Sequence, residues 1–326
     1  MNVPFIGAVI LCMKYGKEID LSGNTNTILN SVIIGIKEII SDNPINRRAK
    51  KEFITNKVLG DGTLKKAKFE DIYNIIAEIS TIYNFINISA DDYKGHDIMN
   101  NFLKVFRRWN SANANEKGEV FTPDHIAQLM YKLGDCNMND FILDPTCGSG
   151  TFLTNSMANM FNEALNKNLN DDEFQKIQID IKANRLFGIE SNEFNATLAG
   201  INMLLHGDGA SNIYNENCFT KLKNLEGLYN KVLMNPPFSQ KDIELKFVYE
   251  TLLKMANDGI LVSILPKPSV KGTISANVEY LKKIFKISKL KAVVSLPRDL
   301  FYPVGADTCI IVLHKNGSNK NNKTLL

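Results

Sequence analysis

The sequence predicts an α/β protein in which an all-helical N-terminal region precedes a doubly wound, mainly parallel β-sheet. Up to about residue 93, apolar positions recur every three or four residues, as in amphipathic helices. Beyond residue 139, short apolar segments alternate with helical segments, which is typical of a parallel sheet covered on both faces. A glycine turn directly after the first of these segments also favours this architecture.

Three apolar stretches predict the N-terminal helices. The run Val3–Met13 lacks a basic segment before it and is too short to span a bilayer, so we expect a buried helix and a natural chain that begins earlier. The other two follow helical spacing at Ile28, Leu29, Val32, Ile33, Ile36, Ile39 and Ile40, and at Ile72, Ile75, Ile76, Ile79, Ile82 and Ile86. A helix over Asp97–Trp109 and the polar loop after it complete a predicted helical domain over residues 1–110, followed by a second domain over residues 111–326.

The second domain is expected to contain the sheet. Its predicted strands are Phe141–Asp144, Leu186–Glu190, Asn212–Tyr214, Lys231–Asn235, Ile260–Leu265, Lys291–Leu296 and Thr308–His314. Between the first two strands, the polar segment Asn166–Asp180 is expected to be an insertion.

Composition excludes several classes of protein. With 44% hydrophobic residues among 326, the chain can bury a sizeable core, and a net charge of +3 permits a polyanionic partner without requiring one. The five cysteines form no CxxC pair, so we expect neither a disulfide framework nor a metal site, and we expect a cytoplasmic setting. No association with a membrane is expected.

The segment Phe141–Leu153 combines a strand, an acid, a glycine turn and the start of a helix. Such a turn brings backbone N–H groups and a carboxylate to the carboxyl edge of a parallel sheet, where a nucleoside-bearing cofactor lies over a helix N-terminus. The candidate cofactor-binding residues of this segment are Asp144, Thr146, Gly148, Ser149 and Gly150.

A second acid, Glu190, ends the next predicted strand. It is placed to accept both ribose hydroxyls of an adenosine, unless it is an ordinary surface glutamate. A nicotinamide dinucleotide site is disfavoured, because the third glycine of the GxGxxG pattern is missing and Glu190 follows much later than the usual spacing of about 20 residues.

Thr122 and Pro123 open the helix that precedes the glycine turn. We expect Thr122 at the N-cap and Pro123 at the first helical position. A capped helix accounts for both residues; alternatively, the hydroxyl and the free N–H groups face a ligand carboxylate.

The fourth predicted strand ends in Asn235-Pro236-Pro237-Phe238. Because neither proline offers an N–H, the chain leaves the sheet there in a rigid, extended form. The Asn235 carboxamide oxygen and the Pro236 carbonyl can accept both hydrogens of an exocyclic amine, which draws its delocalised nitrogen toward sp3 geometry and toward an electrophilic methyl group. Phe238 would stack on the ring. The alternative is a rigid turn without a catalytic role.

Together, the segments Asp144–Gly150 and Asn235–Phe238 resemble the cofactor-binding and catalytic motifs of N6-adenine DNA methyltransferases, and most closely those of modification subunits of type I restriction-modification systems. Gly118–Pro123 and Leu296–Val312 are similar to further segments of that family. The resemblance runs from about Asp97 to Leu313 and is looser in the helical N-terminal region. It implies a Rossmann-like S-adenosylmethionine-dependent methyltransferase sheet.

The resemblance also implies individual roles. Thr122, Pro123 and the glycine turn would bind the methionine moiety of S-adenosylmethionine, and Glu190 its ribose. Asn217 would bind the adenine amine of the cofactor, with Asp208 as the alternative residue.

Three aromatic residues are further implied candidates. Phe247 would pack on the cofactor adenine or else belong to the core, and Phe301 or Tyr302 would hold a flipped target base, since methylation of a duplex base requires its removal from the stack.

The candidate phosphate contacts, which solvated surface positions explain equally well, are Lys282, Lys283, Lys286, Lys289, Lys291 and Arg298.

The implied function is methyl transfer from S-adenosylmethionine to N6 of adenine in double-stranded DNA. No cysteine follows a proline, as the nucleophile of a cytosine C5 enzyme would, so Cys147 is expected to be a packing residue. The alternatives are a protein-glutamine or RNA adenine methyltransferase, and a cofactor-binding subunit that is inactive without a specificity partner. No target-recognition domain is evident, so we expect a specificity subunit as partner, with a restriction subunit as a further candidate.

Overall fold

The computed structural model describes residues 3–41, 62–86, 122–207, 212–238, 244–271, 275–301 and 307–316. The helix expected over Asp97–Trp109 and the domain boundary expected near residue 110 lie outside these ranges, so both stay predictions.

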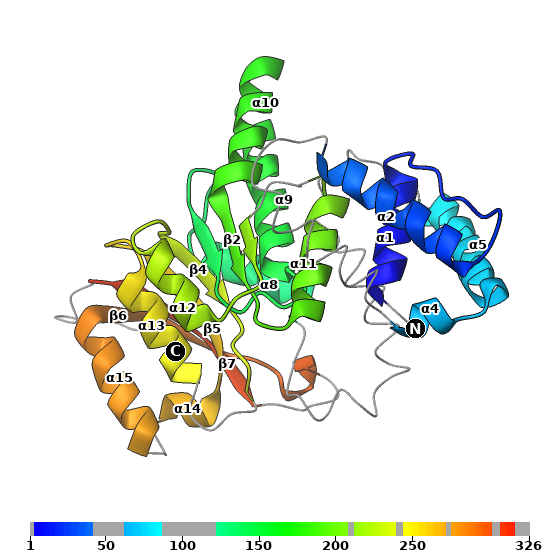
Figure 1. Ribbon diagram of the computed structural model, residues 1–326. Helices are drawn as coiled ribbons and strands as arrows, with labels where there is room; N and C mark the ends of the chain where they lie inside the picture. The colour runs from blue at the N-terminus through cyan, green and yellow to red at the C-terminus, as the bar shows by residue number, and fades with distance from the viewer. Residues whose placement is uncertain are drawn as a thin grey trace.

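The described strands form one seven-stranded sheet in the order β3-β2-β1-β4-β5-β7-β6 (Figure 1). Strands β1 to β5 run parallel, whereas β7 is antiparallel to both of its neighbours. Every expected strand is present, which confirms the doubly wound, mainly parallel fold. The strands are β1 (Ile142–Asp144), β2 (Leu186–Ile189), β3 (Asn212–Tyr214), β4 (Lys231–Met234), β5 (Ile260–Pro266), β6 (Ser288–Ser295) and β7 (Thr308–Lys315).

The last strand pair is longer than expected. β6 begins at Ser288 rather than Lys291, because it pairs with the whole length of β7. A shift in register between Leu290 and Ala292 leaves Lys291 outside the regular ladder. Because the start of β6 is polar and interrupted by this bulge, the sequence predicts only the later part of the strand.

Alternate residues of the central strands face two separate cores. Leu233 and Val262 pack with helices α8, α9 and α11, whereas the adjacent Val232 and Leu261 pack with α13 and α15 on the opposite face. The helical segments are α1 (Val3–Lys14), α2 (Thr25–Ser41), α4 (Gly62–Lys66), α5 (Phe69–Ile86), α8 (Asp124–Leu133), α9 (Thr151–Leu165), α10 (Asp171–Asp180), η1 (Ile181–Arg185), α11 (Glu193–Leu205), α12 (Cys218–Lys221), η2 (Leu222–Leu225), α13 (Glu244–Lys254), α14 (Lys267–Lys271), α15 (Ser275–Ile287) and η3 (Arg298–Phe301).

The N-terminal helices gather on one side of the sheet domain (Figure 1). The apolar helix α1 is almost wholly buried between them and α11, as its sequence predicts. A Cβ atom on Gly35 of α2 would lie 2.8 Å from Cys12 Sγ of α1, so the close approach of these two helices requires glycine.

The end of α1 caps the end of α11. The Lys14 ammonium donates to the Leu205 carbonyl, and the Tyr15 hydroxyl donates to the Leu204 carbonyl at 3.0 Å. These carbonyls belong to the last turn of α11, where the Leu204 carbonyl also accepts the Gly207 N–H at 3.0 Å, and a cation there complements the helix dipole. The helical region is therefore attached to the sheet domain by polar bonds as well as by apolar packing.

The expected insertion forms a protruding helix. α10 begins with a capping box between Asn170 and Glu173, continues into η1, and contributes no buried residue (Figure 1). Within the described ranges, no helix is both long and apolar enough to cross a bilayer.

One prediction concerns His206, which follows α11 at this interface. Burial, with the Lys14 charge adding to it, lowers the pKa of His206 from 6.5 to about 4. Between these pH values the unfolded chain binds more protons than the folded one, so the free energy of unfolding should fall as the pH is lowered from 6.5 to 4, by about 2 kcal/mol.

Urea denaturation at several pH values checks this. We expect His206→Gln to lose less stability than the wild type over this pH interval, whereas His125→Gln, which changes an exposed histidine on α8, should keep the wild-type slope. Equal slopes for wild type and His206→Gln would show that another group causes the acid sensitivity.

Candidate active site

The candidate site lies where the strand order reverses. From β1 the chain builds outward through β2 and β3, and then returns to place β4 on the other side of β1. In open parallel sheets such a reversal leaves a crevice at the carboxyl ends of the two central strands. Three of the predicted site residues, Asp144, Glu190 and Asn235, stand at the carboxyl ends of β1, β2 and β4.

The glycine turn has the backbone geometry that its sequence predicts. Gly148 and Gly150 have φ angles of 53° and 89°, which disfavour side chains, and Gly150 is the N-cap of α9. The Gly148 N–H donates to Glu190 Oε2 at 3.0 Å, and the Asn192 N–H donates to Glu190 Oε1 at 2.7 Å. The Glu190 carboxylate therefore joins the end of β2 to the turn after β1.

Asp144 is the most deeply buried charge of the site. Its side chain is 1% exposed, and its Oδ1 accepts the Thr146 N–H at 3.0 Å. Burial raises the pKa of Asp144 well above its usual 3.8, and the nearby Glu190 charge raises it further. Oδ2 is also buried and has no hydrogen-bond partner among the described residues. Such an oxygen is costly unless a ligand provides a donor or a positive charge.

Asn202 of α11 is a site residue that sequence reasoning missed. It is 0% exposed, and its Nδ2 donates to the Ser149 carbonyl in the glycine turn at 3.2 Å. Asn202 Oδ1 and Ser149 Oγ are buried without partners in the described part of the chain. The available signal in the sequence was an asparagine within the otherwise apolar run over residues 198–205.

The residues of the turn suit a polar ligand such as the methionine moiety of S-adenosylmethionine. Buried side-chain acceptors and hydroxyl groups gather there without hydrogen-bond partners in the described part of the chain. A Cβ atom on Gly148 would meet nothing within 4 Å, so there is open space beside the turn. No cluster of histidine, cysteine or acidic side chains in the described ranges could hold a metal ion.

The Asn-Pro-Pro-Phe loop contacts the helix that precedes the glycine turn. Asn235 Nδ2 donates to Thr122 Oγ1 at 3.1 Å, and Thr122 is 6% exposed. Pro236 is buried, and Phe238 is partly buried against the core that includes α8 and α9. Asn235 and Phe238 thus both attach the loop to the rest of the sheet domain.

The expected cap of α8 is wrong by one residue. Pro123, not Thr122, occupies the N-cap position, and α8 begins at Asp124. The Pro123 carbonyl accepts the N–H groups of Ile126 and Ala127 at 3.0 and 3.1 Å, while the Thr122 hydroxyl bonds to Asn235 instead of capping the helix. The Thr122 hydroxyl bonds to Asn235 in preference to the helix because this bond gives the Asn235 side-chain amide a hydrogen-bond partner.

The two ends of α8 are tied to the two ends of β4. Lys231 at the start of β4 donates to the Gly134 and Asp135 carbonyls after α8, each at 2.7 Å, and Asn235 at the end of β4 donates to Thr122 before α8. These bonds fix the position of α8 along β4.

Asn217, which follows β3, and Phe247, which follows β4, both contact Phe219. Asn217 Oδ1 accepts the Phe219 and Thr220 N–H groups at 3.0 and 3.4 Å, which makes Asn217 the N-cap of α12. Phe247 is 9% exposed, and its ring centre is 4.7 Å from that of Phe219. Contact of either residue with a cofactor adenine stays a prediction.

Several other expectations lie outside the described residues. These are Asp208, Tyr302 and the side chain of Phe301. Cys147, by contrast, belongs to the buried core, and burial raises the pKa of its thiol well above 9.0. A thiol with a raised pKa is a poor nucleophile, which supports its expected packing role.

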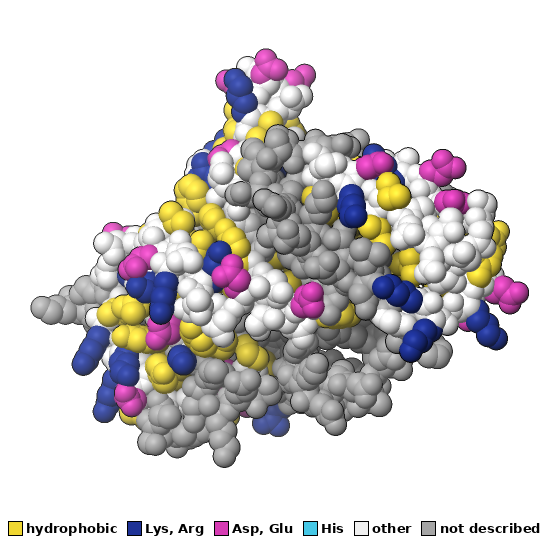
Figure 2. All heavy atoms as spheres, viewed as in Figure 1, with side chains coloured by type: hydrophobic (Ala, Val, Ile, Leu, Met, Phe, Trp, Pro, Cys, Tyr) yellow, Lys and Arg dark blue, Asp and Glu magenta, His cyan; other side chains and the backbone are white. Residues whose placement is uncertain are grey.

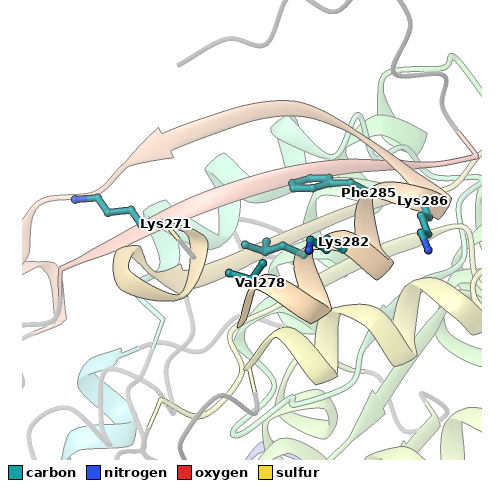
Figure 3. Close-up of a pocket in the computed structure, with 6 residues that line it drawn as sticks. Lys271, Val278, Lys282, Phe285 and Lys286 are labelled. Atoms are coloured by element: carbon teal, nitrogen blue, oxygen red, sulfur yellow. The ribbon is translucent and has the colours of Figure 1, made fainter. Parts of the chain in front are cut away.

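Part of the candidate phosphate-binding surface lies on α15. Basic and apolar side chains are intermixed over α13 and α15 (Figure 2), and Lys282 and Lys286 line a surface groove with a volume of about 550 Å³ (Figure 3). Lys283 forms an ion pair with Glu279 at 2.6 Å. The groove is lined by Lys271, Val278, Leu281, Lys282, Phe285 and Lys286. It shares no residue with the site around β1 and β4.

Comparisons with known proteins agree with this geometry. The N-6 DNA Methylase family model matches residues 95–259 and 241–326. The type II restriction enzyme and methyltransferase RM.BcgI of Heyndrickxia coagulans is 37% identical over 236 residues, which are 70% of this chain and 36% of that protein. The type I MjaVII methylase subunit of Methanocaldococcus jannaschii is 25% identical over 275 residues, 76% of this chain and 44% of the relative. The match thus spans less than half of either relative.

Solved structures show the same fold. A modification subunit of a putative type I restriction enzyme from Vibrio vulnificus superposes with a TM-score of 0.62 at 19% identity, covering 86% of this chain and 60% of that one. A type I methyltransferase subunit from Streptococcus thermophilus gives a TM-score of 0.61 at 18% identity, covering 97% of this chain and 66% of that one.

The buried carboxylate yields a prediction for the cofactor-free protein. Because the folded-state pKa of Asp144 is raised, the unfolded chain releases this proton first as the pH rises above 3.8, so Asp144 makes unfolding easier at higher pH. Asp144→Asn should lose less stability than the wild type between pH 4 and 8.

Chemical denaturation without cofactor measures this difference. Asp172→Asn, which changes an exposed carboxylate on α10, is the control and should follow the wild type. A wild-type pH profile identical to that of Asp144→Asn would mean that the buried carboxylate costs nothing.

Proposed function

Because the chain belongs to the N-6 DNA methylase family, we propose that it binds S-adenosylmethionine and transfers the methyl group to N6 of adenine in DNA, as the modification subunit of a restriction-modification system. One observation carries the proposal. The glycine turn after β1 and the Asn-Pro-Pro-Phe loop after β4 follow paired parallel strands, in which Ile142 is opposite Lys231. A methyl donor bound at the glycine turn and an acceptor amine bound at the Asn-Pro-Pro-Phe loop would therefore be adjacent.

The cofactor would lie over the glycine turn and the start of α9. Asp144 Oδ2 is suited to the ammonium of the methionine moiety, because a positive partner removes the cost of its burial. The α9 N-terminus and Thr122 are suited to the carboxylate of that moiety. Glu190 is suited to the ribose hydroxyls at the end of β2. S-adenosylmethionine supplies an electrophilic methyl group when bound.

The acceptor amine would be activated by the loop. The Asn235 carboxamide oxygen and the Pro236 carbonyl accept its two hydrogens, which localises the nitrogen lone pair and directs it at the methyl group. Phe238 fixes the plane of the base by stacking. Pro237 keeps the loop extended, since it has a fixed φ angle and no N–H.

DNA, a specificity subunit and, as a further candidate, a restriction subunit are the proposed partners, in a cytoplasmic setting. The names of the relatives support restriction-modification as the context. Protein glutamine and RNA adenine remain the competing acceptors, because both present an amide or amine that the same loop could bind. A labelled-methyl assay that compares DNA, RNA and peptide acceptors separates them, and label in RNA or peptide alone would contradict the proposal.

Calorimetric titration with S-adenosylmethionine, followed by a methylation assay, tests the site. We expect Asn235→Ala to retain cofactor binding and to methylate at least about 100-fold more slowly, because it lacks the acceptor for the amine hydrogens. Asn184→Ala, which changes an exposed residue on η1, is the control and should leave both measurements unchanged. If the wild type binds no cofactor, the proposal is wrong; if Asn235→Ala retains the wild-type rate, the catalytic assignment is wrong.

The dependence on a partner is a separate prediction. We expect the isolated chain to bind S-adenosylmethionine but to methylate DNA poorly until a specificity subunit is added, because no described element provides a target-recognition domain. Methylation of plasmid DNA by the chain alone and by the reconstituted complex measures the difference. Robust, sequence-specific methylation by the chain alone would contradict this part.

A further inference from the structure

The hydrogen bond between Thr122 and Asn235 connects the two halves of the site. The residues are 113 positions apart in the sequence, and Asn235 Nδ2 lies 3.1 Å from Thr122 Oγ1. One residue precedes the helix beside the glycine turn, and the other follows β4. The contact therefore joins a residue suited to the cofactor with the residue suited to the acceptor amine.

Both partners stand on restricted backbone. Thr122 directly precedes Pro123, which has φ −65° and ψ 146°, and Asn235 directly precedes Pro236 and Pro237. A residue before proline is largely confined to extended conformations. The bonds from Lys231 to the carbonyls after α8 hold the other ends of this helix and strand together. The distance between the two side chains is thus set by the fold, with little freedom for local adjustment.

The direction of the hydrogen bond between Asn235 and Thr122 decides which atom of the Asn235 carboxamide is available to the acceptor amine of the substrate. A carboxamide presents an acceptor oxygen on one side and donor hydrogens on the other. Because Nδ2 donates to Thr122, Oδ1 is directed away from this contact. Rotation of the amide by 180° would instead present N–H groups to an amine that itself has hydrogens to donate.

The Thr122 hydroxyl has a further capacity. A hydroxyl accepts from one group and still donates its own proton to another, and donation strengthens it as an acceptor. A ligand carboxylate that accepts the Thr122 O–H would therefore strengthen the bond from Asn235.

We propose that Thr122 is a positioning residue that fixes the orientation of the Asn235 carboxamide and couples it to cofactor binding. The coupling rests on the proposed function; the orienting bond itself is a property of the cofactor-free protein. Thr122 acts through Asn235 and takes no part in the reaction.

The direct test is NMR of the Asn235 side-chain amide in the cofactor-free protein, assigned by its loss in Asn235→Ala. Thr122→Val removes the hydroxyl and keeps the branched shape, so we expect the two Asn235 amide proton signals to shift and to show increased mobility. Thr122→Ser restores a hydroxyl and should restore the wild-type signals. Unchanged Asn235 signals in Thr122→Val would overturn the proposal.

The second test measures cofactor affinity and single-turnover methylation with saturating S-adenosylmethionine, in the assembly in which the wild type is active. We expect Thr122→Val to be about 10- to 100-fold slower even at saturation, because misorientation of a catalytic group is not corrected by more cofactor. Thr122→Ser should recover most of the rate. A Thr122→Val defect that disappears at saturating cofactor would reduce Thr122 to a cofactor ligand and overturn its positioning role.

A matched control is Thr251→Val. Thr251 is a 0% exposed threonine on α13 whose hydroxyl has no partner among the described residues, so this variant removes a buried hydroxyl without breaking a bond. Its Asn235 signals and its rate should equal those of the wild type. The two proposals fail separately, since a wild type that does not bind S-adenosylmethionine refutes the proposed function, whereas the amide signals test the orienting bond without cofactor.

Discussion

Parallel pairing between β1 and β4 is the constraint on which the site depends. These strands are separated in sequence by three helical connections, yet their pairing brings Asp144 and Asn235 to one edge of the sheet. A shift of this register by one residue would exchange the two faces of β4 and move Leu233 from one core to the other. The same apolar packing that stabilises the sheet therefore aligns the polar groups at its edge.

The site stores unfavourable free energy in the absence of a ligand. The buried Asp144 carboxylate and the side chains of Ser149 and Asn202 each have a polar atom without a partner among the described residues, which costs stability that the surrounding core must offset. Core strands buried on both faces, and α1 with its polar bonds to the end of α11, provide this stabilisation. Groups that are costly when alone become favourable when a ligand of opposite charge and matching donors binds, which is how polar sites obtain selectivity.

Much of the fold was predictable from local pattern. The strands were recognised because residues buried on both faces form short apolar runs between helices, and the glycine turn because positive φ angles favour glycine. The start of β6 was not predictable, because its pairing with β7 compensates for its polar residues. The sequence predicts a helix cap at Thr122 for a similar reason. The local sequence shows only the start of the helix, whereas the hydrogen-bond partner of the hydroxyl, Asn235, is 113 positions away.

The sequence by itself determined the residue types of the site: an acid after one strand, a second acid after the next, and a rigid Asn-Pro-Pro-Phe loop after the fourth. It also determined the alternation that produces a parallel sheet. Only the tertiary structure decided which groups are buried, that Asn202 reaches the glycine turn, and that the Asn235 amide points its nitrogen at Thr122. The physical reason is that residue type and spacing follow from local chemistry, whereas burial and hydrogen-bond direction depend on segments that meet only in the folded chain.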